Sequence, residues 1–228
     1  MNQEPVTLLK VLVGSRAHHT ADPKSDYDYR SVFVHKTRDL LSLGTKLHGT
    51  KWTEADKQVG ETQDDTGWEL GHFLNLAMHC NPSILEVFVA PVVFGASGFA
   101  GEVQSLFPNV WNPKGVRDAF IGYGLNQRKK FLEDKDAKPA KYASAYLRVL
   151  DQAEQLLGTS GFLPVDMRDS PVYDTLKRWR VGEFTKGEVI DTCLRWQDAV
   201  EMAYIGCTHK PNLDRVNKFL LDVRKEYW

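Results

Sequence analysis

The first part of the chain carries short apolar and aromatic runs of strand length. Val6 to Val13 is an apolar run that ends at Gly14, and Tyr27 to His35 is rich in aromatic and β-branched residues. Both runs are typical of β-strands. Residues 15–25 between them predict a loop or a short helix, and the largely polar residues 36–65 predict loops and a hairpin.

Helical periodicity begins at residue 68 and dominates the second half of the chain. Trp68 to Met78 has apolar residues three and four positions apart, and Asn81-Pro82 ends that pattern. The apolar run Ile84 to Phe94 fits either a helix or a strand. After the turn at Pro113-Lys114-Gly115, the pattern predicts five helices, at 116–134, 140–157, 171–180, 186–205 and 212–227. This order predicts an α/β (α+β) fold, in which a small mixed β-sheet is followed by a helical bundle.

Composition narrows the class of protein. The chain has 228 residues, of which 42% are hydrophobic and 26% charged, as in an ordinary globular protein. The formal net charge of −1 gives no global field for a polyanion, so we expect no duplex DNA partner. No apolar run reaches the roughly 18 residues of a membrane span, so we expect no membrane partner either.

The cysteines and the N-terminus favour a cytoplasmic location. Cys80, Cys193 and Cys207 are odd in number, far apart and outside any C-x-x-C pattern, so they suggest neither a disulfide framework nor a zinc site. Residues 1–10 lack the basic and then apolar pattern of a signal peptide.

The segment from Gly14 to Arg30 carries the candidate chemistry. Side chains two positions apart on a strand share a face, so Asp26 and Asp28 project two carboxylates side by side. Oxygen ligands in that arrangement suit a hard divalent cation such as Mg²⁺. The break at Gly14-Ser15 would present backbone N–H groups and a hydroxyl to an anion. Together these features predict a nucleoside triphosphate (NTP) held over metal.

Three further residues belong to this segment. Arg30 shares the face of the two carboxylates, which predicts a link to a carboxylate or a phosphate, with a surface ion pair as the alternative. His18 and His19 lie in the turn itself and are candidates for contact with the triphosphate or the acceptor.

These residues resemble a known family. Gly14-Ser15 followed by Asp26-x-Asp28 on the next strand resembles the signature of the DNA polymerase beta nucleotidyltransferase superfamily, and Ser25 to Arg30 resembles its RNA repair pathway DNA polymerase beta branch. Residues 68–77 and 80–86 are similar to that branch's aromatic-Glu-Leu helix with its Asn-Pro and Leu-Glu. Residues 141–161 are similar to its later helix and turn. The sequence departs from the branch at Gly71 and His72, where the branch commonly has basic residues.

The resemblance implies a metal-dependent nucleotidyltransferase that moves a nucleoside monophosphate from an NTP to an RNA end, such as that of tRNA, or to another hydroxyl acceptor, releasing pyrophosphate. The change from mixed to helical patterns near residue 115, taken with this resemblance, predicts a catalytic core at residues 1–112 and a helical domain at 113–228 that closes over the nucleotide. The cofactor would be Mg²⁺ or Mn²⁺. RNA repair is the implied setting.

The resemblance also implies roles for single residues. Asp26 and Asp28 match the first two metal-binding carboxylates, and the third is Asp64, with Asp65 as the alternative. The remaining candidates are phosphate or RNA contacts: Gly14 and Ser15 for the β- and γ-phosphates, and Arg30, Lys141 and Arg148 as basic contacts.

Two other functions stay open at this point. One is a non-catalytic nucleotide-binding, RNA-binding or regulatory protein on a degenerate nucleotidyltransferase scaffold. The other is an enzyme of the toxin–antitoxin type that transfers AMP to a protein. The acceptor, RNA or protein, the base preference and the oligomeric state are not specified by the sequence.

Overall fold

The computed structural model describes residues 4–23, 25–43, 51–56, 63–96, 98–158 and 161–228. Its centre is a five-stranded sheet in the order β3-β4-β2-β1-β5. The β2–β4 pair is parallel and the other three pairs are antiparallel. The strands are β1 (Val6–Val13), β2 (Tyr27–Val34), β3 (Lys51–Asp56), β4 (Gln63–Glu69) and β5 (Val92–Gly95).

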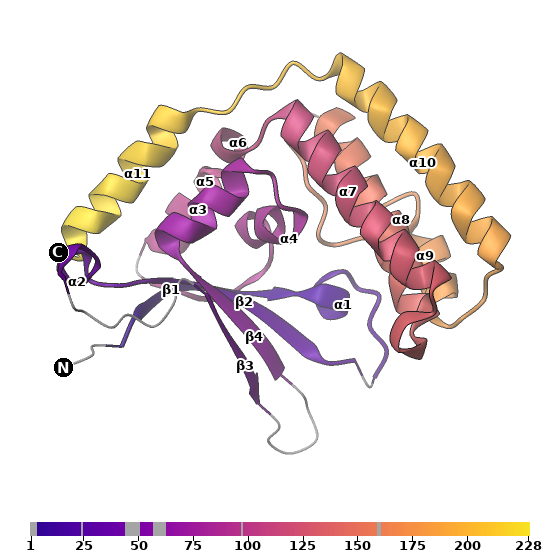
Figure 1. Ribbon diagram of the computed structural model, residues 1–228, viewed down its shortest axis with the longest axis horizontal. Helices are drawn as coiled ribbons and strands as arrows, with labels where there is room; N and C mark the ends of the chain where they lie inside the picture. Colours follow the sequence, from indigo (N-terminus) through magenta and orange to yellow (C-terminus); the bar gives the residue numbers. More distant parts are fainter. Residues whose placement is uncertain (1–3, 24, 44–50, 57–62, 97, 159–160) are drawn as a thin grey trace.

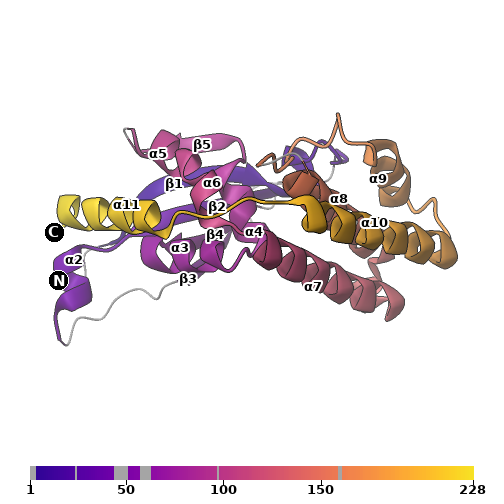
Figure 2. The same ribbon diagram turned by 90° about the horizontal axis from the view of Figure 1, so that it is seen from above.

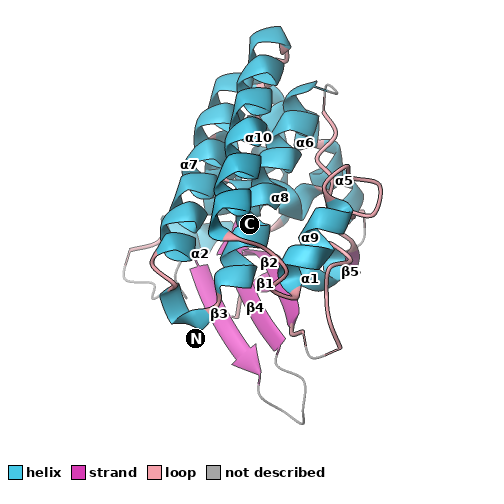
Figure 3. Ribbon diagram, turned by 90° about the vertical axis from the view of Figure 1, so that its right-hand side faces the viewer, coloured by secondary structure: helices cyan, strands magenta, loops and turns pink. Residues whose placement is uncertain are grey.

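Helices lie above the sheet and beside its right-hand end (Figures 1 and 3). The shorter ones are α1 (Gly14–Ala17), α2 (Thr37–Leu41), α3 (Leu70–Met78), α4 (Pro82–Leu85), α5 (Phe99–Ser105), α6 (Phe107–Val110) and α9 (Tyr173–Arg180), with 3₁₀ turns η1 (Glu86–Phe88) and η2 (Lys135–Ala137). The longer ones are α7 (Pro113–Leu132), α8 (Pro139–Gly158), α10 (Lys186–Gly206) and α11 (Leu213–Glu226). In the described part of the chain no helix has both the length and the apolar character needed to cross a membrane.

The predicted mixed fold is confirmed, as are the first two strands and the five late helices, within a few residues. The run Ile84 to Phe94 is divided among α4, η1 and β5. The short helices α5 and α6 were not predicted. Of the polar stretch 36–65, the structure describes α2, β3 and the start of β4; Gly44, Gly49 and Gly60 lie outside the described residues.

The boundary between β4 and α3 differs from the sequence prediction. Trp68 and Glu69 end the strand, although the periodicity predicts that they begin the helix. The Glu69 side chain accepts a hydrogen bond from the Gly71 N–H at 2.7 Å and so caps α3 from the strand side. Thr66-Gly67 is a poor strand sequence, yet it continues β4, because β2 and β3 pair with it on both sides.

The hydrophobic core lies between the sheet and the helices. It includes Val11 and Val32 from the sheet, and Phe73, Phe88 and Tyr146 from the helical elements, each fully buried or nearly so. Phe73 and Phe88 stack with ring centroids 4.8 Å apart. This continuous core fixes the helices relative to the strands that carry the candidate carboxylates.

The last helix returns to the sheet region. After α10 the chain crosses above the molecule, and α11 lies beside α3 and α6 (Figures 1 and 2). At the crossing, His209 stacks on the buried Trp111 with ring centroids 3.7 Å apart, and the Asn212 N–H donates to the Asn109 carbonyl. The far end of α11 is fixed by Arg224, which forms a 2.6 Å ion pair with Glu69.

Breaking the pair between α11 and the core is expected to destabilise the protein. Arg224→Met leaves the buried Glu69 carboxylate without its cation, which should cost about 3 kcal/mol of unfolding free energy. Denaturant titration measures this loss. Lys218→Met on the same helix is the matched control, because its pair with Asp222 is exposed and should contribute below about 1 kcal/mol. Equal losses of unfolding free energy in the two variants would show that the buried Arg224–Glu69 pair contributes no more than an exposed pair.

A second prediction concerns the buried Asp151 on α8. Its Oδ2 accepts hydrogen bonds from Gln155 and Ser170, both at 2.9 Å, and burial raises its pKa to about 6. Since the folded state then holds a proton that the unfolded state releases near pH 4, stability falls as pH rises through about 4 to 6.

Asp151→Asn removes this titration and keeps an oxygen for both donors. The stability of the variant relative to the native chain should therefore increase by about 2 to 3 kcal/mol between pH 4 and pH 8. Chemical unfolding at several pH values measures the difference, and two parallel stability curves would show that Asp151 does not titrate as expected.

Candidate functional site

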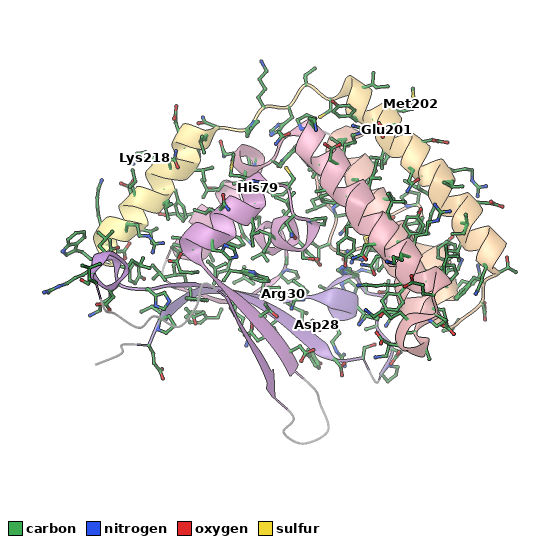
Figure 4. All side chains as sticks on the ribbon, viewed as in Figure 1. Asp28, Arg30, His79, Glu201, Met202 and Lys218 are labelled. Atoms are coloured by element: carbon green, nitrogen blue, oxygen red, sulfur yellow. The ribbon has the colours of Figure 1, made fainter. Side chains whose placement is uncertain are left out.

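One cavity of about 690 Å³ lies between the sheet and helices α7, α8 and α9. Its size falls within the range of ligand-binding pockets. Figure 4 labels Asp28 and Arg30 on β2 beside α1, at the sheet side of this cavity. Nine of the eleven candidate residues from the sequence line the cavity, and His19 and Asp65 do not: Gly14, Ser15, His18, Asp26, Asp28, Arg30, Asp64, Lys141 and Arg148.

The parallel pairing of β2 and β4 brings the carboxylates together. Asp28 is paired directly with Asp64, so the two side chains share a face of the sheet. Asp26 and Arg30 precede and follow Asp28 by two positions and line the same cavity. Tyr27 alternates with them, and its ring is covered by the Arg16 guanidinium at 3.8 Å.

Asp65 lies on the opposite face of the sheet. Its carboxylate is buried. The Ser31 hydroxyl lies 3.0 Å from each of its two oxygens and donates to them, and Lys10 Nζ forms an ion pair with Oδ2 at 2.9 Å. Asp65 is not among the residues that line the cavity. Of the two candidates for the third carboxylate, Asp64 is therefore the one that shares a cavity with Asp26 and Asp28.

Gly14 begins the turn that approaches Asp28. Its φ of +71° is in the left-handed region, and a Cβ placed there would lie 2.2 Å from Asp28 Oδ2. Only glycine allows both the conformation and this close approach. The turn then forms one short helical segment, in which the His18 N–H donates to the Gly14 carbonyl and the Thr20 N–H to the Ser15 carbonyl.

The loop that connects this turn to β2 is held by backbone and side-chain contacts. Arg16 donates to the Ser25 carbonyl from Nε and Nη2, at 3.1 and 2.7 Å. The Tyr173 hydroxyl, from α9, donates to the His19 carbonyl at 2.9 Å. The turn is therefore attached both to the sheet and to the helices on the other side of the cavity.

Basic side chains line the helical side of the cavity. They are Lys138 and Lys141 at or near the start of α8, Arg148 in the middle of α8, and Arg180 at the end of α9. Arg148 donates to Gln152 at 2.8 Å, and Gln152 in turn donates to the Pro164 carbonyl, which fixes the direction of α8's side chains here. The cavity thus has carboxylates on its sheet side and cations on its helical side.

The electrostatics of Asp28 reflect this environment. Burial raises its pKa, Arg30 and Lys141 oppose that change, and the neighbouring carboxylates Asp64 and Asp26 add to it. Three carboxylates in mutual repulsion would be stabilised by a cation between them. Within the described residues, no group of three or more His, Cys, Asp and Glu side chains is placed so that it could hold a metal ion by itself.

Mg²⁺ binds through one or two carboxylates and completes its shell with waters and substrate phosphates. Asp28 and Asp64, which are paired across β2 and β4, are carboxylates of the kind that this cation takes.

Sequence reasoning did not assign several residues that the structure brings to the cavity. Glu86 belongs to the Leu-Glu pair already noted in the resemblance, but its position gave no sign that it reaches the cavity. Arg180 ends a helix pattern far along the chain. Ser144, Tyr123 and Gln127 come from the helices and carry no motif.

Comparison with known proteins gives uncharacterized relatives in sequence and similar solved structures. The chain is 28% identical over 138 residues to an uncharacterized 38.9 kDa protein in the nrdC-mobD intergenic region of Enterobacteria phage T4, covering 60% of this chain and 38% of that protein. It is 26% identical over 130 residues to the uncharacterized protein YcgL of Bacillus subtilis (strain 168), covering 57% and 48%. The matches thus span less than half the length of these relatives.

A nucleotidyltransferase-like protein from Exiguobacterium sibiricum 255-15 aligns in structure with 97% of this chain and 75% of its own, at 12% identity and a TM-score of 0.33. The profile of the RNA repair pathway DNA polymerase beta family matches residues 1–178, from β1 into α9. The match covers the turn at Gly14, the paired strands β2 and β4 and the basic part of α8. The chain therefore belongs to the RNA repair pathway DNA polymerase beta family.

Proposed function

We propose that the protein is a metal-dependent nucleotidyltransferase that transfers a nucleoside monophosphate from an NTP to an RNA end and releases pyrophosphate. One observation carries the proposal: three carboxylates and the Gly14-Ser15 turn face basic side chains across a single cavity. Carboxylates on one side suit metal, and cations on the other suit phosphates. The RNA repair pathway description of the family favours RNA over protein as the acceptor.

In the proposed site Asp26, Asp28 and Asp64 would hold Mg²⁺ or Mn²⁺. When bound, these cations supply neutralisation of charge at the reacting phosphates. The turn at Gly14 and Ser15 binds the β- and γ-phosphates through its hydroxyl and backbone N–H groups. Lys141 and Arg148 neutralise the triphosphate and the pyrophosphate that leaves.

Positioning accounts for most of the proposed chemistry. The acceptor hydroxyl forms a bond to the α-phosphorus, and the bond between that phosphorus and the bridging oxygen of pyrophosphate breaks. Asp64 is exposed, so its carboxylate lies where an acceptor arriving from solvent can reach it and assists removal of the hydroxyl proton. Arg30 balances the charge of Asp28 from the same strand face.

The reaction is tested by incubating the purified protein with each α-³²P-labelled NTP and Mg²⁺ or Mn²⁺. Separate samples contain tRNA, short RNA or total cell protein. Label on RNA is expected. Label on protein alone would make the protein a transferase of the toxin–antitoxin type, and metal-dependent NTP binding without transfer to any acceptor would make it a binding protein.

The neighbouring residues Asp64 and Asp65 provide a matched test of the site. Asp28→Asn or Asp64→Asn should reduce transfer about 100-fold or more, because each loss weakens stabilisation of the transition-state charge by several kcal/mol. Asp65→Asn should leave transfer within about 3-fold, because Asp65 lies on the opposite sheet face. Initial rates measure both effects. Full activity of Asp28→Asn, or equal losses at Asp64 and Asp65, would refute the assignment.

A glycine substitution tests the approach between the turn and β2. Gly14→Ala places a methyl carbon 2.2 Å from Asp28 Oδ2, so that carboxylate must move. Transfer should fall by about 100-fold or more, while backbone strain lowers stability by about 1 to 2 kcal/mol.

Gly122→Ala on α7 is the control, because its Cβ would meet nothing within 4 Å. It should keep full activity and gain up to about 1 kcal/mol of stability. Transfer rates and thermal unfolding of both variants provide the comparison, and a fully active Gly14→Ala would show that the close approach is not needed.

A further inference from the structure

The deep part of the cavity holds polar side chains that the proposed transfer chemistry does not use. His18 follows α1, Glu86 begins η1 and Ser144 lies on α8, so three separate elements contribute. Their exposed fractions are 2%, 8% and 7%, and all three line the cavity. They are therefore buried in the protein and still adjoin the space available to a ligand.

These side chains present polar atoms without partners. Within the described residues, both ring nitrogens of His18, Glu86 Oε1 and Ser144 Oγ have no hydrogen-bond partner. His18 Nε2 and Glu86 Oε1 are 3.1 Å apart, but they are not aligned as a hydrogen bond. Leaving a buried polar atom without a partner costs free energy, so four such atoms at one cavity need an explanation. A ligand bound in the cavity would supply the missing hydrogen bonds.

The donors and acceptors of His18, Glu86 and Ser144 limit the kind of ligand that they can bind. A neutral imidazole has one donor and one acceptor, a serine hydroxyl has both, and a carboxyl group has an acceptor oxygen in either protonation state. Ionised phosphate oxygens only accept hydrogen bonds, so they would leave the acceptors of this group unsatisfied. Ribose hydroxyls and the edges of nucleobases both donate and accept.

The charge states agree with a neutral ligand group. Burial lowers the pKa of His18 well below its usual range, and Arg148, Arg180 and His19 lower it further, while Asp166 opposes them. Burial raises the pKa of Glu86, and Asp28 raises it further, against the effect of Arg148 and Arg30. Both directions favour an uncharged pair.

We infer that His18, Glu86 and Ser144 form the subsite for the nucleoside part of the NTP and hydrogen-bond its ribose hydroxyls or base edge. This inference rests on the proposed function, since it places the rest of the same substrate. The phosphates then lie toward the Gly14-Ser15 turn and the basic side chains.

The test separates nucleoside binding from phosphate binding. With Mn²⁺ present, calorimetry measures the affinity of ATP, GTP, CTP, UTP, dATP and inorganic tripolyphosphate for the native chain and its variants. Ser144→Ala is the main variant, because it removes one hydroxyl without a partner and should unfold at the same temperature or higher. Its affinity for the preferred NTP should fall about 3- to 10-fold, and its affinity for tripolyphosphate should stay within about 2-fold.

Two more variants complete the design. Glu86→Gln keeps the shape of the side chain but changes its hydrogen bonding, so it should reduce discrimination among nucleotides. Lost preference for ATP over dATP would assign Glu86 to the ribose, and lost preference among the four bases would assign it to the base edge. Ser105→Ala on α5 is the control, because that hydroxyl is exposed, bonds within its own helix and does not line the cavity.

The outcomes separate the two proposals. Parallel losses of NTP and tripolyphosphate affinity in Ser144→Ala would mean that the group binds phosphate, which overturns this inference and leaves the proposed function intact. NTP affinity and selectivity unchanged in both Ser144→Ala and Glu86→Gln would also overturn it. A native chain that binds neither NTP nor tripolyphosphate would overturn the proposed function itself.

Discussion

The parallel register between β2 and β4 is the constraint on which the site depends. It pairs Asp28 with Asp64 and sends both carboxylates to the side of the sheet that faces the helices. A shift of one residue in this pairing would turn Asp64 away and bring Asp65 to the cavity. The contacts of Asp65 with Lys10 and Ser31 on the other face oppose such a shift, because they would be lost.

The sheet supplies half of the site, and the helices supply charge of the opposite sign. Arg148 and Arg180 come from helices that follow the sheet in sequence and face the same space. The hydrophobic core fixes the helices relative to the sheet, so the cavity lies between two sides of opposite charge. Buried side chains such as Tyr146 and Phe88 belong to that core.

Local patterns predicted the parts of the site that lie on one element. The alternation along β2 was enough to place Asp26, Asp28 and Arg30 on one face. The choice between Asp64 and Asp65 required the register of a second strand, which depends on pairing between distant residues. Glu86 and Ser144 reach the cavity only because α4, η1 and α8 pack together. The periodicity of the sequence does not predict which helices pack against each other. Helices α5 and α6 are too short to show a clear repeat.

The crossing segment between α10 and α11 has a mechanical consequence. The chain leaves the sheet region next to Trp111 and comes back beside it, where His209 stacks on that ring and Asn212 bonds to Asn109. Helices α7–α10 are thus connected to the sheet region by two segments of chain that contact each other at Trp111. On the other side of the cavity, the Tyr173 hydroxyl of α9 donates to the His19 carbonyl in the segment that follows the Gly14 turn. A displacement of that segment would therefore be passed to α9 through this hydrogen bond.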